Sequence, residues 1–600
     1  MEELKRSILS WYDMAPSDKV LMASSCPEAV LSLVKDRCGS VSFSEDEMPG
    51  GGFDLIIDLE HIESSSDPKA CLDRLISLLS PSGRLIFIVN NRYGLKYFCG
   101  TPDPHSKIPF DGVNGYLSGQ AEDGKCMSRR EVEALIGDIP HKYFYPMPDA
   151  RMPQMIYTDG FTDAAPLRER LLDYDYEDRS MIGLEHRILP DSVEGGALPF
   201  LANSFLIEVR PDGKLNDTVF AVMTEDRGSS RGLVTSVRED GTVIKRPLYK
   251  DGRVHMEYIA SLNGDLVSKG IPIVKTDLEE DVYGPFLKMP RITKEPLSSV
   301  MRREAAASSD TLIRRFDRIR DLVKAASSSS RTDSSTGELI LSEAYLDLAP
   351  FNAFCDGEDI LFYDQEFMKK DASIQYVMYR MLKYFFEFAY EIKDDAFKAS
   401  LYERYGITDE LRQKYEVIEK DFIKSVRDRE RYEELYKMAT PDKEMILRRM
   451  KQIAEDGRKP YRIGYVPGVF DLLHRGHINL LRRCKERCRY LIVGVLTDDL
   501  VEYYKNKRPV MSYEERAEVL RAVCYVDEVI PVDMSNTDKL DAWEQLHYDC
   551  HFSGDDHVGH WNDVLVKLRE RGSNMEFFHY TDGISSTSIK EKMKEEGQKG

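Results

Sequence analysis

Residues 461–481 contain the pattern that most restricts the fold of this 600-residue chain. The residues before Gly468 favour a strand, and the glycine turn after them leads into a helix. His474 and His477 lie three residues apart, so one helix face carries both imidazoles. N–H groups at a helix start attract phosphate, and Gly476 leaves room for a nucleotide. The segment therefore predicts a strand–turn–helix unit that binds a phosphorylated ligand.

Two motifs in this last part of the chain resemble those of the cytidylyltransferase family, within the nucleotidyltransferase superfamily. The first is the family's Gly-x-Phe-Asp-x-x-His-x-Gly-His (HxGH) stretch, matched here by Gly468, Phe470, Asp471, His474, Gly476 and His477. The second is a Gly-Ile-Ser-Thr type turn, matched here by Thr581, Gly583, Ile584, Ser585, Ser586 and Thr587. Tyr580 stands where the glycerol-3-phosphate branch carries an arginine.

The resemblance implies transfer of CMP from CTP to a phospho-alcohol, with pyrophosphate as the leaving group. The acceptor would be of the glycerol-3-phosphate or phosphocholine type, and the CDP-alcohol would serve cell-surface polymer synthesis. His474 and His477 would donate to phosphate oxygens, and Lys505 or Lys507 would bridge the two phosphates. Mg²⁺ would accompany the triphosphate without a dedicated protein metal site. The other residues expected at the nucleotide are Val466, Asp498, Arg516 and Asp555.

Two other functions stay open at this point. On the same fold, an adenylyltransferase would use ATP with a flavin or pantetheine phosphate. Alternatively, the chain is a largely non-catalytic scaffold built on three degenerate enzyme folds. Homodimers are common in the cytidylyltransferase family, which makes a homodimer one expectation for this chain.

The patterning predicts a multidomain α/β protein with four segments. Residues 1–215 alternate buried apolar runs with helical patterns, and residues 216–400 open with alternating segments. Residues 401–459 are charge-rich and helical, and we interpret them as a connector. Residues 460–600 form a Rossmann-like nucleotidyltransferase domain if the family resemblance holds.

The first segment resembles a class I methyltransferase. Leu79–Phe87 is similar to a loop and strand of that fold, and Asn91–Phe98 is similar to methyltransferases of surface-polysaccharide synthesis. Residues 23–28, where the fold needs its glycine-rich loop, contain no glycine. Glycines let the backbone approach the cofactor there, so we expect no tight binding of S-adenosylmethionine.

The second segment resembles the aminoglycoside- and choline-kinase-like branch of the kinase fold, which is an α+β fold. Asp347 and Asn352 match the Asp and Asn of the family's catalytic loop, and Asp364 matches its magnesium-binding Asp. Lys245 and Glu257 are expected to form the ion pair that orients the phosphates. An active kinase and an inactive relic both remain open.

Net charge, apolar runs and cysteine spacing indicate which partners and which cellular compartment suit the chain. The net charge of −21 argues against a general nucleic-acid binder. No apolar run approaches the ~20 residues of a membrane span. The ten cysteines are scattered without metal-site spacing, which favours a reduced, cytoplasmic chain.

Overall fold

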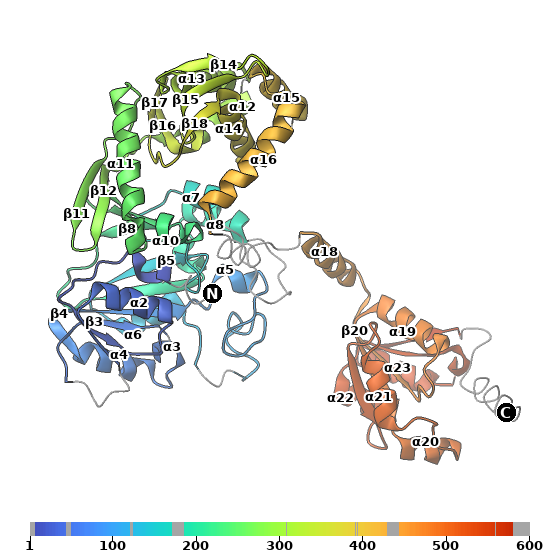
Figure 1. Ribbon diagram of the computed structural model, residues 1–600. Helices are drawn as coiled ribbons and strands as arrows, with labels where there is room; N and C mark the ends of the chain where they lie inside the picture. The colour runs from blue at the N-terminus through green and yellow to red at the C-terminus, as the bar shows by residue number, and fades with distance from the viewer. Residues whose placement is uncertain are drawn as a thin grey trace, which may run out of the picture. The chain divides into compact units, whose positions relative to one another are not determined.

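In a computed structural model, the chain divides into two units, Met1–Asp442 and Lys443–Gly600 (Figure 1). The structure describes residues 6–43, 50–59, 61–120, 124–170, 185–307, 309–389, 392, 394–428, 443–558 and 560–579. Both units combine β-sheets with flanking helices, which confirms the expected multidomain α/β class.

A twelve-stranded sheet runs through the first unit, in the order β11-β12-β10-β9-β8-β6-β5-β7-β4-β3-β1-β2. At one end lie four parallel strands: β1 (Lys19–Met22), β2 (Ser40–Phe43), β3 (Phe53–Asp58) and β4 (Leu79–Asn90). The apolar runs in β1, β3 and β4 are therefore buried parallel strands, as the sequence predicts. Leu55 and Ile57 pack with helix α2 (Glu28–Arg37), and Ile56 packs on the opposite face with α4 (Pro68–Ser77). Burial on both faces explains why these runs are continuously apolar.

The sheet continues beyond β4 with antiparallel strands. These are β7 (Ser204–Val209), β5 (His141–Met147), β6 (Met155–Tyr157), β8 (Thr218–Met223), β9 (Leu233–Arg238), β10 (Thr242–Pro247), β12 (Gly284–Pro290) and β11 (Asp277–Asp281). The pairing of β6 with β8 carries the sheet across residue 216, where the sequence analysis expects a domain boundary. The four-segment division stays a prediction.

The rest of the first unit is built on a helical core. Its strands are β13 (Glu295–Pro296), β14 (Ser330–Thr332), β15 (Leu339–Tyr345), β16 (Ala353–Asp356), β17 (Asp359–Phe362) and β18 (Met368–Ser373). Its main helices are α11 (Arg253–Ser268), α12 (Leu297–Ala307), α13 (Ser309–Ala325), α14 (Ile374–Phe388), α15 (Asp395–Arg404) and α16 (Asp409–Val426). Helix α16 belongs to the expected connector, but Tyr415 and Glu419 on it are buried, and the Glu419 carboxylate accepts from Tyr376 and Arg380 of α14.

Shorter helices complete the first unit. They are α1 (Ser7–Ser10), α3 (His61–Ser64), α5 (Leu95–Phe98), α6 (Arg129–Ile136), α7 (Ala165–Arg170), α8 (Glu185–Glu194), α9 (Leu198–Leu201) and α10 (Gly228–Arg231).

The second unit is a parallel five-stranded sheet in the order β21-β20-β19-β22-β23. Its strands are β19 (Tyr461–Gly468), β20 (Cys488–Leu496), β21 (Glu528–Val532), β22 (Cys550–Gly554) and β23 (Asn574–Phe578). Its helices are α18 (Lys443–Gly457), α19 (Arg475–Arg487), α20 (Asp498–Lys505), α21 (Tyr513–Arg521), α22 (Lys539–Leu546) and α23 (Asn562–Glu570).

Alternate residues of the first strand of this sheet point to opposite faces. Val466 packs with Leu481 of α19 and Leu520 of α21, whereas Tyr465 packs with α22 and α23. The chain order reverses at β19, with β20 on one side and β22 on the other. In such open sheets ligands bind beyond the carboxyl ends of the strands at this reversal, so the loops after β19 and β22 are the expected site.

Within the described residues, no helix has both the length and the apolar character needed to cross a bilayer.

Candidate functional site

Two stacked histidines occupy the loop and helix start that follow β19. The ring centroids of His474 and His477 lie 3.9 Å apart, with 20° between the ring planes. Phe470 meets the His477 ring edge-on at 5.3 Å. The two imidazoles therefore share one surface, as their three-residue spacing predicts, and we call them the histidine pair.

The protonation of the histidine pair follows from its contacts. Gly476 N–H donates to His474 Nδ1 at 3.1 Å, which makes His474 the N-cap of α19. A neutral His474 consequently carries its proton on Nε2 and can donate it to an anion. Burial lowers the pKa of His474, and burial together with His474 lowers the pKa of His477 to about 4. Both rings are thus uncharged donors at neutral pH.

The loop that presents the histidine pair has an unusual backbone. Phe470 and Leu472 have φ values of 54° and 52°, in the left-handed region that non-glycine residues rarely adopt. A Cβ on Gly468 would lie 2.7 Å from the Phe470 ring, so a larger residue there would displace that ring. Backbone strain of this kind is concentrated at functional sites.

Asp471 and Asp498, which the sequence predicts to contact the nucleotide, instead form hydrogen bonds within the protein. The Asp471 carboxylate accepts from the N–H groups of Val510 and Met511, which ties the loop to the segment after α20. The Asp498 carboxylate accepts from Tyr513 N and contacts the Arg516 guanidinium. These carboxylates therefore stabilise the fold of the loops around the histidine pair.

The direct contact predicted between Arg516 and the nucleotide is wrong. The Arg516 side chain is 0% exposed, and it donates to the carbonyl oxygens of Val469, Leu496 and Met511. It therefore joins the histidine loop, the end of β20 and the loop before α21. Arg516 is a positioning residue.

Three of the remaining predicted residues of this unit lie within the described part of the chain. Lys505 and Lys507 are exposed at the end of α20, and no hydrogen bond or ion pair to another described residue restrains either side chain. Asp555 directly follows β22, and His579 contacts its carboxylate. The second motif, Thr581, Gly583, Ile584, Ser585, Ser586 and Thr587, lies outside the described residues.

Comparison with known proteins identifies this unit. A family model described as "Cytidylyltransferase-like" matches residues 465–592. The glycerol-3-phosphate cytidylyltransferase of Bacillus subtilis is 38% identical over 126 residues, which cover 21% of this chain and 92% of that enzyme. The chain belongs to the cytidylyltransferase-like family.

Other relatives of the cytidylyltransferase-like domain act on different substrates. An FAD synthase of Thermococcus kodakarensis is 37% identical over 122 residues, covering 20% of this chain and 80% of that protein. An ethanolamine-phosphate cytidylyltransferase of Dictyostelium discoideum is 38% identical over 138 residues, covering 22% of this chain and 36% of that protein. The similarity supports nucleotidyl transfer and leaves the substrate open.

In the first unit, a second group of predicted residues comes together around Lys245 of β10. The Lys245 ammonium contacts the carboxylates of both Asp364 and Glu366. The Asp347 carboxylate accepts from the N–H groups of Glu366 and Phe367 at 2.9 and 2.8 Å. We call Lys245, Asp347, Asp364 and Glu366 the lysine–carboxylate cluster.

Two features of the lysine–carboxylate cluster are typical of functional sites in general. Burial raises the pKa of Asp347 to about 6, although Arg380 acts in the opposite direction. Asp364 has a φ of 57°, which is unusual for a non-glycine residue. Asn352 Nδ2 donates to the backbone carbonyl of Asp347 at 3.4 Å, which holds the predicted loop together.

The expected ion pair between Lys245 and Glu257 is wrong. Glu257 is half exposed and pairs with Arg253 one turn away on α11. The buried residue of α11 near the cluster is His255, whose pKa is lowered to about 4 by burial. Sequence reasoning missed His255 and Glu366, although Glu366 stands only two residues after the predicted Asp364.

Proposed function

We propose that the chain transfers CMP from CTP to the phosphate of a phospho-alcohol, giving a CDP-alcohol for cell-surface polymers and pyrophosphate. The observation that carries this proposal is the histidine pair, stacked at the start of α19 beside the reversal point of the sheet. The relatives named for glycerol-3-phosphate and ethanolamine-phosphate cytidylyltransferases support the same reaction class.

The reaction needs no covalent intermediate with the protein. An oxygen of the acceptor phosphate attacks the α-phosphorus of CTP, and the bond from that phosphorus to the pyrophosphate oxygen breaks. His474 Nε2–H and the N–H groups at the start of α19 donate to phosphate oxygens as charge shifts toward the leaving group. Because the donors are fixed beforehand, positioning supplies much of the rate.

The two lysines at and just after the end of α20 extend this donor surface. Lys505 and Lys507 are exposed on the segment that Asp471 anchors through Val510 and Met511. We propose that one of them bridges the attacking and leaving phosphates. A flexible lysine side chain can keep its ammonium group near the negative charge as that charge moves toward the pyrophosphate.

The described residues do not build a Mg²⁺ site in this unit. The carboxylates of Asp471 and Asp498 are occupied by backbone N–H groups, and Asp498 also contacts Arg516. Mg²⁺ that arrives with CTP would therefore keep triphosphate oxygens and water as its ligands.

The competing activity is adenylyl transfer from ATP to a flavin phosphate, since FAD synthases are also relatives. Pyrophosphate release with each of the four nucleoside triphosphates, against phospho-alcohols and FMN, separates the two. The proposal predicts release with CTP and a phospho-alcohol. Release with ATP and FMN alone would overturn it, and no release with any pair would favour the scaffold.

A second activity is proposed for the first unit: phosphorylation of an alcohol by ATP. The lysine–carboxylate cluster supports it, because Asp347 is buried beside the segment that carries Asp364 and Glu366. Asp347 would accept the proton of the alcohol as its oxygen attacks the γ-phosphorus and ADP leaves. Asn352 and Asp364 offer the oxygen donors that Mg²⁺ prefers. The phospho-alcohol made here would then be the acceptor for CTP.

The proposal also covers the cellular compartment and the oligomeric state in which both activities take place. No disulfide joins any of the ten cysteines, all of which lie in the described part of the chain, and this suits a reducing compartment such as the cytoplasm. A homodimer is proposed from the family resemblance alone.

A further inference from the structure

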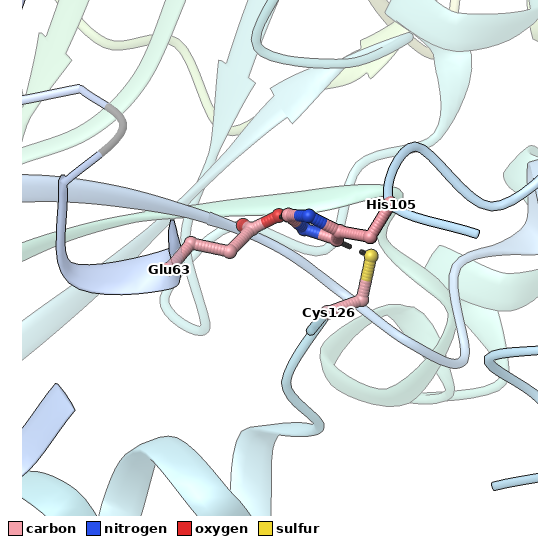
Figure 2. Close-up of side chains that lie close together, drawn as sticks. All are labelled: Glu63, His105 and Cys126. Atoms are coloured by element: carbon pink, nitrogen blue, oxygen red, sulfur yellow. Dashed lines mark hydrogen bonds and ion pairs between the residues drawn. The ribbon is translucent and has the colours of Figure 1, made fainter. Parts of the chain in front are cut away.

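Three metal-ligating side chains meet in the first unit, beyond the carboxyl ends of β3 and β4 (Figure 2). Glu63 belongs to the short helix α3 after β3, and Cys126 lies next to Met127, which bridges to Asn91 after β4. His105 comes from the loop between them. In open α/β sheets this edge is where ligands bind. Neither proposed activity uses these residues.

The three donor atoms face one another. His105 Nε2 lies 2.7 Å from Glu63 Oε1, and Cys126 Sγ lies 4.0 Å from the same oxygen. The three donor atoms lie within 4.8 Å of one another. Glu63 and Cys126 are 6% and 2% exposed, and the His105 side chain is 13% exposed. A thiolate, an imidazole and a carboxylate are the ligand types of Zn²⁺.

A second layer of hydrogen bonds fixes each ligand. Asn90 donates to the Glu63 carboxylate through both its backbone N–H and its Nδ2. Asp103 accepts from the N–H of His105 and from the hydroxyl of Tyr116. That hydroxyl in turn accepts from the N–H of Cys126 at 2.7 Å. Metal ligands in proteins are commonly oriented by such outer contacts.

The backbone around the three residues has little freedom. A Cβ on Gly124, whose φ is 103°, would lie 2.5 Å from the Glu63 carbonyl oxygen. Lys107, Phe110 and Tyr116 have φ values of 62°, 63° and 62° in the same connection. Several left-handed non-glycine residues in one loop indicate strain, and strain of this kind is retained at ligand sites.

We propose that Glu63, His105 and Cys126 bind one Zn²⁺, with water as the fourth ligand. Two anionic ligands balance the charge of the cation, and three protein ligands with one exchangeable position are typical of catalytic rather than structural zinc. Ligand atoms of tetrahedral zinc lie about 3.4 Å apart, so the His105–Glu63 contact must lengthen by about 0.7 Å on binding. Zinc displaces the thiol proton of Cys126 to solvent. The proton shared by His105 Nε2 and Glu63 also leaves that nitrogen, so the zinc-bound, neutral His105 carries its single proton on Nδ1.

The spacing of these ligands explains why the sequence analysis expected no protein metal site. Glu63, His105 and Cys126 are separated by 42 and 21 residues, far from any short metal-binding motif. The fold of the connection between β4 and α6 brings His105 and Cys126 to Glu63, which lies on α3 before β4.

The test uses the full chain, stripped of metal with a chelator and then titrated with Co²⁺. Thiolate coordination gives a near-ultraviolet charge-transfer absorption, and one equivalent of Zn²⁺ should abolish it. We expect Cys126→Ser to lose this absorption. His105→Gln should bind Co²⁺ at least 10-fold more weakly, because removing a direct ligand lowers metal affinity at least as much as removing an outer hydrogen-bond partner. Near-ultraviolet circular dichroism reports whether each variant is folded.

The matched control is Cys71→Ser, because Cys71 Sγ lies 3.6 Å from His61 Nδ1 and forms a second thiol–imidazole pair in the same unit. This control should titrate like the wild type. A wild-type chain without the absorption, or identical titrations for the wild type and His105→Gln, would overturn the proposal. The cluster would then be a hydrogen-bonded Glu63–His105 pair beside a neutral thiol.

Discussion

The histidine pair and the lysine–carboxylate cluster differ in charge before any nucleotide arrives. His474 and His477 are neutral because burial lowers both pKa values. Lys245 is charged: although burial opposes it, Asp364 and Glu366 hold its pKa above the ordinary value. The histidine site is thus built from neutral rings, whereas the other site has already paired its cation with two anions.

This difference in charge determines whether an incoming phosphate must break an existing ion pair. At the histidine pair a phosphate gains donors without breaking an ion pair, so the site is preorganised for a polyanion. At the lysine–carboxylate cluster a phosphate competes with Asp364 and Glu366 for Lys245. Nucleotide binding there requires the carboxylates to find another cation, such as Mg²⁺ or the Arg227 that already contacts Glu366.

The largest effect should follow Asp347→Asn in the first unit. With ATP, CTP and a free alcohol, CDP-alcohol formation should fall about 10²–10⁴-fold, because an amide cannot act as the base. The wild-type rate should rise as pH passes about 6, the value to which burial raises the pKa of Asp347. Asp371→Asn is the control, since Asp371 is exposed and asparagine tolerates its φ of 50°. Equal rates for both variants would leave the cluster without a kinase role.

Residues that are close in the chain lie together in the structure, as the sequence predicts, whereas the roles assigned to them stay predictions. The HxGH stretch and the strand and helix around it are contiguous, so their residues meet through local geometry alone. Asp347 and Asn352 are likewise five residues apart on one loop. The partners of Lys245 could not be predicted in the same way, because β10 and the segment 364–366 meet only through the folded sheet and core. The kinase resemblance suggested Glu257, but that residue is half exposed and pairs with Arg253 on α11.

The second prediction tests whether the buried Arg516 positions the histidine loop or binds phosphate. Arg516→Ala should lower the free energy of unfolding of the second unit by about 3–5 kcal/mol, because Asp498 and three carbonyl groups lose their donor. Hydrogen exchange of the β19 and β20 amides in the full chain measures this change.

The matched control for that arginine is Arg508→Ala. Arg508 is 64% exposed and pairs with Asp499 and Glu502 at the surface, so its removal should leave the free energy of unfolding close to the wild-type value. If both variants exchange alike, Arg516 does not hold the histidine loop, and the nucleotide contact rejected above would have to be reconsidered.

The smallest effect concerns pH. His551 is 1% exposed, and burial lowers its pKa to about 3. The unfolded chain binds a proton at this residue below about pH 6.5, whereas the native state does not, so the free energy of unfolding falls as the pH falls. His551→Phe should reduce this slope by up to about 1.4 kcal/mol per pH unit, measured by exchange of β22 amides between pH 6.5 and 5. An unchanged slope would mean that His551 is protonated in the native state.

The most direct test compares the two sites in one assay: pyrophosphate release from CTP with a phospho-alcohol supplied. His477→Ala should reduce the rate about 10²–10³-fold, because a preorganised donor is lost. Asp347→Asn should keep the wild-type rate, since the phosphorylation step is bypassed. His547→Asn, at an exposed helix end with a φ of 47°, is the histidine control and should also keep it. Wild-type turnover by folded His477→Ala would contradict the assignment of nucleotidyl transfer to the histidine pair.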